Sequence, residues 1–316
     1  MTIDVGLVGV GAMGSQLARR LAGGGFSPLA FDEDLERVAA VDAVGGIRAA
    51  TSLRELGGCD IVITMLPDGA AVRAVVLGGP DAGGLAGLLR TGATVVDMSS
   101  SAPEGTVELA RLLRGQDLHL LDAPVSGGTA RAASGTLSIM VGGHEGDLAR
   151  CRPVLEVLGS QIFHTGPVGS GHALKALNNM LSAAGLTVAL EVMAVGQRFG
   201  LDPCVMLAVL NASTGRNNST ENKIAQQVLS RAFAHGFATK LMVKDLTIAV
   251  DLAHHTGTPV PVSAACLETW KAALQEVGGE IDHTAIARYI EQRAGVILRA
   301  HTERSGPATP NEGCDR

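Results

Sequence analysis

One stretch of the chain places an amine, amides and a hydroxyl at helical spacing. Lys175 and Asn179 are four residues apart, and Asn178 and Ser182 lie on neighbouring turns of the same face. A lysine partly desolvated beside a ligand can have its pKa lowered enough to exchange a proton with an alcohol or carbonyl near neutral pH. An asparagine beside it can orient that group. The same spacing also fits a lysine whose ammonium only reaches solvent beside an interdomain seam.

A glycine-rich turn near the N-terminus has the residue types that bind a dinucleotide. Residues 9–14 fit G-x-G-x-x-G, in which glycines allow a tight turn, close approach of the backbone to pyrophosphate, and close packing of helix on strand. The motif follows a predicted strand and opens a predicted helix over 15–22. It predicts cofactor contacts at Gly9, Gly11, Ala12, Met13 and Gly14. A glycine-rich turn without a ligand is the alternative.

An acidic residue follows the second predicted strand, 18 residues after Gly14. Asp32 can accept hydrogen bonds from ribose hydroxyls, and its charge would repel a 2'-phosphate. No arginine follows it in the turn over 31–34. NAD is therefore favoured over NADP as the cofactor, although Asp32 could instead lie in a solvated loop or cap the helix over 35–40.

A further polar loop follows the strand that ends at Asp122. Successive backbone amides at Ser126, Gly127 and Gly128 could form a concave nest for an anion such as a carboxylate. Ser-Gly-Gly is also ordinary turn chemistry.

Short apolar runs alternate with helical stretches up to about residue 164, which predicts parallel βαβ units. Runs such as IVITML and TVVDM lack the alternation of apolar and polar residues that a half-exposed strand shows. This is expected when helices cover both faces of a sheet. The predicted class is α/β, a doubly wound parallel sheet of the Rossmann type. We expect its strands at 3–8, 29–31, 61–66, 94–98, 118–122, 137–141 and 162–164.

The second half of the chain is predicted to be helical throughout. Residues 172–199 contain no proline and only isolated glycines, which predicts one helix of about 28 residues. Further helices are expected at 204–210, 220–229, 241–256, 262–276 and 284–299. The predicted domains are an NAD-binding domain over 1–166, an all-α substrate and oligomerisation domain over 167–301, and a flexible tail over 302–316.

Composition excludes several classes of protein. The chain has 316 residues, of which 46% are hydrophobic and 18% charged, as in a globular protein of about two domains. The net charge of -6, without long like-charge runs, argues against a nucleic-acid partner. The apolar stretch at 180–190 is far shorter than the roughly 20 residues of a membrane span. The N-terminus enters a strand pattern without a leader, so we expect no membrane partner and a cytoplasmic location.

The cysteines are five in number and widely separated, without a C-x-x-C pair. They predict reduced, mostly buried thiols, and neither a metal site nor a disulfide framework.

Together these motifs resemble the β-hydroxyacid dehydrogenase family, which includes 3-hydroxyisobutyrate dehydrogenase and tartronate semialdehyde reductase. The similarity extends from about residue 3 to residue 299. It comprises GVGAMG at 9–14, ITMLP at 63–67, DAPVSGG at 122–128, GTLSIMVGG at 135–143, GSGHALKALNN at 169–179 and KDL at 244–246.

The resemblance implies a Rossmann-type domain, a long interdomain helix and a helical domain that forms homodimers or homotetramers. It also implies reversible oxidation of a small 3-hydroxy acid to a semialdehyde with NAD. Lys175 matches the family's catalytic lysine, and Asn179 matches its substrate-orienting asparagine. The segment that binds the substrate carboxylate is matched by Ser126, Gly127 and Gly128.

The resemblance also assigns residues to the cofactor. Leu66, Pro67 and Ser100 match positions that line it, and Lys244 matches a lysine that approaches the nicotinamide end from the helical domain. Ser100 stands where threonine is more usual, which keeps the hydroxyl.

The polar stretch over 213–222 lies where family members shape the pocket around the far end of the substrate. Its polarity favours a hydroxylated acid such as threonate or glycerate over 3-hydroxyisobutyrate, although a solvent-exposed loop explains the same residues. Two rival functions are a non-catalytic dinucleotide-binding module and an imine reductase. Lys175 argues against both.

Overall fold

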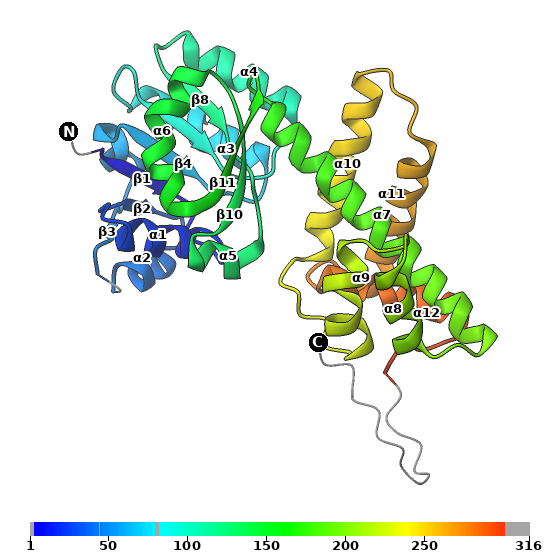
Figure 1. Cartoon of the computed structure of the whole chain (residues 1–316). Helices are drawn as coiled ribbons and strands as arrows, with labels where there is room; N and C mark the ends of the chain where they lie inside the picture. Colours follow the sequence, from blue (N-terminus) through cyan, green and yellow to red (C-terminus); the bar gives the residue numbers. More distant parts are fainter. Residues whose placement is uncertain (1–2, 44, 80–81, 301–316) are drawn as a thin grey trace. The chain divides into compact units, whose positions relative to one another are not determined.

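The structure is a computed structural model that describes residues 3–43, 45–79 and 82–300 (Figure 1). The chain divides into two compact units, residues 1–176 and 177–316. The division falls inside the long helix α7 (Ser170–Phe199). The domain boundary at residue 166 stays a prediction.

The first unit contains one sheet of nine strands in the order β11-β10-β8-β7-β4-β1-β2-β3, with β9 paired to β10. A separate short pair is formed by β5 (Gly78–Gly79) and β6 (Ala82–Gly83). The strands of the large sheet are β1 (Val5–Val8), β2 (Leu29–Phe31), β3 (Arg48–Ala49), β4 (Ile61–Thr64), β7 (Thr94–Asp97), β8 (His119–Asp122), β9 (Val125–Ser126), β10 (Leu137–Gly142) and β11 (Gly159–Gly166).

The seven predicted strands are all present, with ends that differ by a few residues. The ladder from β2 through β1, β4 and β7 to β8 is parallel, as predicted. One edge differs from an all-parallel sheet: β10 runs antiparallel to β8 and to the short β9, so the sheet is mixed.

Helices bury both faces of the sheet. One core lies under α1 (Gly14–Gly23), α2 (Leu35–Asp42), α5 (Gly128–Ser134) and α6 (Glu145–Leu158), and the other lies under α3 (Gly69–Leu77) and α4 (Pro103–Arg114). Along β4, Ile61 and Ile63 join the first core while Val62 joins the second. Because successive strand residues point to opposite faces, two buried faces require an unbroken apolar run, which explains the missing alternation.

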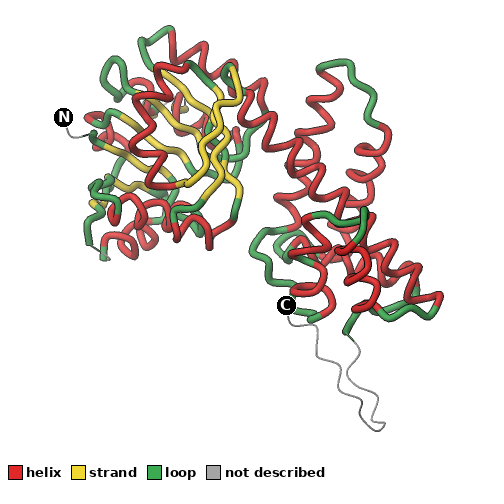
Figure 2. Tube along the Cα trace, viewed as in Figure 1, coloured by secondary structure: helices red, strands yellow, loops and turns green. Residues whose placement is uncertain are grey.

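The second unit is helical in its described residues (Figure 2). It contains the later part of α7 and then α8 (Pro203–Ala212), α9 (Asn218–Asn222), a π-helical segment (Ile224–Leu229), α10 (Thr239–His255), α11 (Pro261–Val277) and α12 (Ile286–Ala294). The last predicted helix was too long, because Gly295 adopts a left-handed conformation (φ 65°) that ends α12. The predicted tail over 302–316, with Cys314, lies outside the described residues.

Helix α7 alone among the described helices has the length and apolar composition of a membrane span, and 56% of its most apolar window is buried inside the structure. Partial burial of this kind is typical of a core helix. Cys59, Cys151 and Cys266 are buried, and no disulfide forms among the described residues. Burial raises the pKa of Cys59 to about 11 and that of Cys151 to about 12, which keeps both thiols protonated.

Candidate active site

The three glycines of the first loop have three different structural roles. Gly9 has φ +94°, and a Cβ there would lie 2.4 Å from the carbonyl oxygen of Met65. A Cβ at Gly14 would lie 1.9 Å from the carbonyl oxygen of Gly9, which shows how closely α1 packs on the loop. Gly11 is open, with only the Arg37 guanidinium within 4 Å, at 3.9 Å. Gly9 therefore makes the tight turn, Gly11 leaves the backbone open to a ligand, and Gly14 allows the helix to pack closely. These are the three roles that a dinucleotide-binding loop requires.

The start of α1 fits a pyrophosphate. Its N-cap residue, Met13, makes no side-chain capping hydrogen bond, and the first turn contains no acidic residue. The first N–H groups of a helix lack partners inside the helix and attract anions. The residues present therefore fit the phosphate part of NAD.

Asp32 connects the end of β2 to the glycine loop. Its carboxylate accepts hydrogen bonds from the backbone N–H groups of Val10 (2.8 Å) and Asp34 (3.0 Å). Arg37, one turn into α2, lies 3.9 Å from Asp32 and 3.1 Å from Asp34. The turn over 31–34 indeed lacks an arginine, but the helix that follows brings one beside Asp32.

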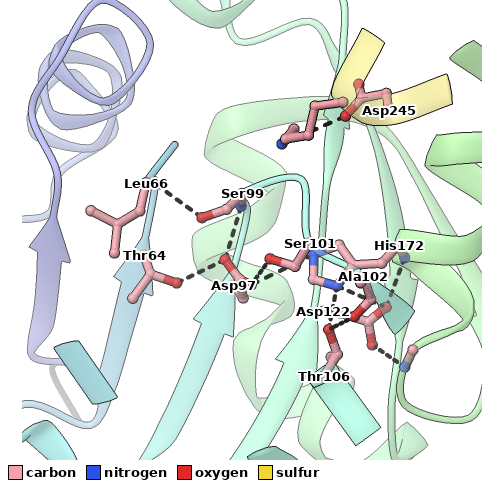
Figure 3. Close-up of polar contacts among 12 residues, drawn as sticks. Thr64, Leu66, Asp97, Ser99, Ser101, Ala102, Thr106, Asp122, His172 and Asp245 are labelled. Atoms are coloured by element: carbon pink, nitrogen blue, oxygen red, sulfur yellow. Dashed lines mark hydrogen bonds and ion pairs between the residues drawn. The ribbon is translucent and has the colours of Figure 1, made fainter. Parts of the chain in front are cut away.

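A buried carboxylate organises the loops after β4 and β7 (Figure 3). Asp97 is 2% exposed and accepts hydrogen bonds from the Thr64 hydroxyl (2.9 Å), the Ser99 N–H (3.0 Å) and the Ser101 hydroxyl (3.0 Å). The Ser99 hydroxyl in turn accepts a hydrogen bond from the Leu66 N–H (2.9 Å). This network holds the loops that contain the predicted cofactor residues Leu66, Pro67 and Ser100.

A second buried carboxylate holds the start of α7. Asp122, fully buried at the end of β8, accepts hydrogen bonds from the backbone N–H groups of Gly169 (2.7 Å) and His172 (2.9 Å). Between them, a Cβ at Gly171 would lie 2.4 Å from the Met140 carbonyl oxygen and 2.8 Å from that of Asp122. The first turn of α7 is thus pressed against the strand ends, which fixes its direction and register.

The imidazole of His172 completes this buried group. Its Nδ1 lies 2.8 Å from the Thr106 hydroxyl, which itself donates to the Ala102 carbonyl (3.1 Å). The hydroxyl therefore accepts from Nδ1–H. The Nε2 atom has no hydrogen-bond partner in the described chain and lies 3.6 Å from the Asp97 carboxylate.

The Ser126–Gly128 loop contains two exposed glycines with positive φ angles. Gly127 has φ +134° and Gly128 has φ +68°, and both are exposed. A Cβ at Gly127 would lie 2.5 Å from the Arg131 side chain. Glycine is therefore required here by conformation as well as by space.

The polar face of α7 is arranged by a residue that the sequence analysis did not assign. Asn179 is 8% exposed, and its amide group donates to the carboxylate of Asp245 on α10 (2.6 Å). Asp245 is 1% exposed and lies 3.6 Å from the Lys244 ammonium, while Lys175 is half-buried. The KDL motif contained only part of the signal: Asp245 lies on the buried face of α10, where a carboxylate needs a polar partner.

The structure distributes the predicted residues between the two units. The glycine loop, Leu66, Pro67, Ser100 and the Ser126–Gly128 loop follow strands of the first unit, and Lys175 lies on the part of α7 that belongs to it. Asn179 and Lys244 belong to the second unit. The assignment of these residues to cofactor, substrate and catalysis stays a prediction.

Some of the polar residues in the stretch over 213–222 cap the start of α9. The Asn217 side chain accepts hydrogen bonds from the N–H groups of Ser219 (2.8 Å) and Thr220 (3.2 Å) at the start of α9. Ser219 and Thr220 are each 1% exposed. Lys223, which follows α9 and is 4% exposed, was not singled out from the sequence.

Two family models together cover most of the chain. Residues 4–166 match the NAD binding domain of 6-phosphogluconate dehydrogenase. Residues 169–290 match the NAD-binding domain of NADP-dependent 3-hydroxyisobutyrate dehydrogenase.

Named relatives cover nearly the full length of the chain. It is 35% identical to 2-(hydroxymethyl)glutarate dehydrogenase of Eubacterium barkeri, over 94% of this chain and 98% of that protein. It is 36% identical to 3-hydroxyisobutyrate dehydrogenase of Pseudomonas aeruginosa, over 83% and 89%. The structure of Mycobacterium tuberculosis 3-hydroxyisobutyrate dehydrogenase with L-serine matches with a TM-score of 0.83 and 29% identity, over 92% and 99%. The chain therefore belongs to the β-hydroxyacid dehydrogenase family and is an NAD(P)-dependent oxidoreductase that acts on the CH–OH group of hydroxy acids.

Proposed function

We propose that the chain reversibly oxidises a small 3-hydroxy acid to its semialdehyde, with Lys175 as the proton-exchanging group and Asn179 as the residue that orients the substrate oxygen. The observation that carries this proposal is the buried hydrogen bond between Asn179 and Asp245, one turn along α7 from Lys175. A buried amide with a fixed orientation on the face that contains a half-buried amine is suited to aligning an alcohol for proton transfer.

Oxidation removes a hydride from the carbinol carbon and a proton from its hydroxyl, so that the C–O single bond becomes a carbonyl. NAD, when bound, supplies the hydride acceptor. Lys175, as a neutral amine, accepts the hydroxyl proton and returns it in the reverse reaction. Asn179 uses one amide hydrogen for Asp245, which leaves the second for the substrate oxygen.

The substrate carboxylate is assigned to the Ser126–Gly128 loop. Gly127 and Gly128 are exposed residues, and their backbone N–H groups with the Ser126 hydroxyl are donors suited to an anion. The names of the relatives point to several acids of this class, among them 3-hydroxyisobutyrate and 2-(hydroxymethyl)glutarate.

The test is a substrate panel with NAD and with NADP, followed by the absorbance of the reduced cofactor. The panel contains 2-(hydroxymethyl)glutarate, 3-hydroxyisobutyrate, 3-hydroxypropionate, 3-hydroxybutyrate, glycerate and threonate, together with amines as substrates for the imine reductase alternative. Turnover of at least one hydroxy acid with NAD is expected. Turnover of amines alone, or of nothing, would overturn the proposal.

We also propose that the chain is a cytoplasmic homodimer or homotetramer. Large apolar side chains are exposed along one stripe of α7, with Leu181 at 76%, Val195 at 70% and Phe199 at 84%, and α8 adds Val205 at 62% and Val209 at 58%. Contiguous exposed apolar surface of this kind marks an association surface. A second copy of the chain is the partner that we assign to it.

A further inference from the structure

Lys223 is a buried amine that the proposed proton transfer does not use. The residue is 4% exposed, and its Nζ donates to the Ser182 hydroxyl over 2.9 Å. No carboxylate oxygen of the described chain lies within 4.0 Å of this nitrogen. An ammonium has three donors, so this amine is incompletely satisfied.

Ser182 places this amine on the face of α7 that carries the candidate chemistry. Ser182 follows Asn179 by three residues and Lys175 by seven, so the three side chains share one helix face. Seven residues correspond to about 10 Å along the axis. Within the second unit, the Lys223 ammonium therefore lies at the face of α7 that contains Asn179 and Ser182.

The surroundings of Lys223 are short of negative charge. Asp282 is the acidic group that acts on it, but the Asp282 carboxylate already accepts hydrogen bonds from the N–H groups of Gly236 (2.7 Å) and Thr284 (3.0 Å). The other titratable groups near it are His235 and His283. Burial and then the charge of Lys223 lower the pKa of both imidazoles, to about 3 for His283. Burial also lowers the pKa of Lys223 itself, against the opposing effect of Asp282.

A buried cation without a close counter-ion is costly, and an anion that supplies one binds there strongly. We propose that Lys223 and Ser182 bind a second carboxylate of the substrate, remote from the carbon that is oxidised. The inference rests on the proposed function and narrows it to 3-hydroxy acids with two carboxylates. A distal hydroxyl, as in threonate, would accept a hydrogen bond from the ammonium but would not neutralise its charge.

The first test uses the wild-type enzyme and three compounds that share the reacting group. These are 2-(hydroxymethyl)glutarate, its analogue with the distal carboxylate replaced by a primary amide, and 3-hydroxyisobutyrate. We expect kcat/KM to be roughly 10- to 100-fold higher for the diacid than for the amide, the range for a hydrogen bond to a charged group. Equal values for the diacid and the amide, with turnover of both, overturn this inference and leave the proposed function standing. No turnover of the three, with turnover of another hydroxy acid of the panel, also overturns this inference, whereas no turnover of any hydroxy acid overturns the proposed function instead.

The second test removes the positive charge of Lys223. In Lys223→Met the ratio of the kcat/KM values for the diacid and for its amide should fall to about one, mainly through a higher KM for the diacid. Lys223→Arg should retain a preference for the diacid. The control is Lys271→Met, which removes an exposed lysine of α11 that pairs with Glu268 and should change neither value. An unchanged ratio in Lys223→Met contradicts the assignment, and if that variant does not fold, the wild-type comparison of diacid and amide decides.

Discussion

The buried carboxylate of Asp122 accepts a hydrogen bond of 2.9 Å from the backbone N–H of His172, three residues before Lys175. Its other oxygen accepts from Gly169 over 2.7 Å. One side chain thus satisfies two N–H groups at the start of α7 and places a negative charge at the positive end of the helix dipole. Asp122 is therefore a positioning residue for the lysine.

Replacement of Asp122 by asparagine should destabilise the protein. The amide group retains one acceptor but turns a donor toward the second N–H, which leaves a buried group unsatisfied, at a cost of about 1–3 kcal/mol. Urea unfolding measures the loss. Asp68→Asn is the matched control, because Asp68 caps α3 through Ala71 at a less buried position and asparagine is an equally good cap there. Equal stability of the two variants would show that the Asp122 charge is unimportant.

Lys175→Ala should lower kcat by roughly 10²- to 10⁴-fold, as expected for the loss of an acid–base group, and should leave NADH affinity nearly unchanged. Steady-state kinetics and fluorescence titration with NADH measure the two quantities. Lys175→Arg separates proton exchange from charge, because arginine keeps the charge but does not release its proton near neutral pH. Near wild-type turnover in either variant would contradict the assignment.

Asp32→Ser should shift the preference from NAD toward NADP. The carboxylate that repels a 2'-phosphate is removed, and Arg37 beside it is left to attract that phosphate. We expect the ratio of kcat/KM values to move by about tenfold or more, which corresponds to about 1.4 kcal/mol. In Asp32→Ser with Arg37→Ala, most of the gain for NADP should disappear. A wild-type enzyme that already prefers NADP would contradict the role of Asp32.

His283 should make the fold sensitive to acid. Burial, with the nearby charge of Lys223, lowers its pKa from 6.5 to about 3, against the opposing effect of Asp282. Because the folded pKa lies below the unfolded value, the unfolded chain binds the proton first, and stability falls as the pH drops from about 6.5 toward 3. For one titrating group, the free energy of unfolding changes by at most about 1.4 kcal/mol per pH unit.

Denaturant unfolding across this pH range tests the role of His283. His283→Phe keeps a ring beside Trp270, which stacks on the imidazole at 6.4 Å between centroids, but cannot be protonated. The variant should therefore show a shallower loss of stability in acid. His255→Gln, at an exposed position near the end of α10, should retain the wild-type slope. An equally steep loss in His283→Phe would assign the acid sensitivity to other groups.

An aspartate on the exposed apolar stripe should dissociate the proposed oligomer. Phe199→Asp and Val195→Asp each place a charge on the surface that we assign to a second copy of the chain. Sedimentation velocity should show an oligomer for the wild type and monomers for the variants. Leu35→Asp, at an exposed apolar position on α2 in the other unit, is the control and should not dissociate it. A monomeric wild type would contradict the proposal.

The sequence predicted the features that depend on neighbouring residues. Strand runs such as 61–66 and 94–98 were recognisable because burial on both faces demands continuous apolar residues. The glycine loop was recognisable because its three glycines stand at a fixed spacing, at which Gly9 and Gly14 leave no room for a side chain.

The contacts that position the candidate residues join distant parts of the chain and were not predicted. Asn179 meets Asp245 across 66 residues, and Lys223 meets Ser182 across 41. Nothing in the spacing of either pair indicates the contact, because tertiary packing of separate helices determines it. The end of the last helix was wrong for a local reason, since Gly295 was not recognised as a left-handed cap.

The absence of a side chain at Gly171 has a consequence for how this protein can change its specificity. Carbonyl oxygens 2.4 and 2.8 Å from the place that a methyl group would occupy leave no volume for even alanine, so the helix cannot slide or rotate at its origin without losing the fold of the strand ends. With Lys175 in its proposed role, the reacting end of a substrate would meet this fixed geometry. Differences in the length and charge of substrates would then be matched by side chains farther along α7 and on the helices that pack against it.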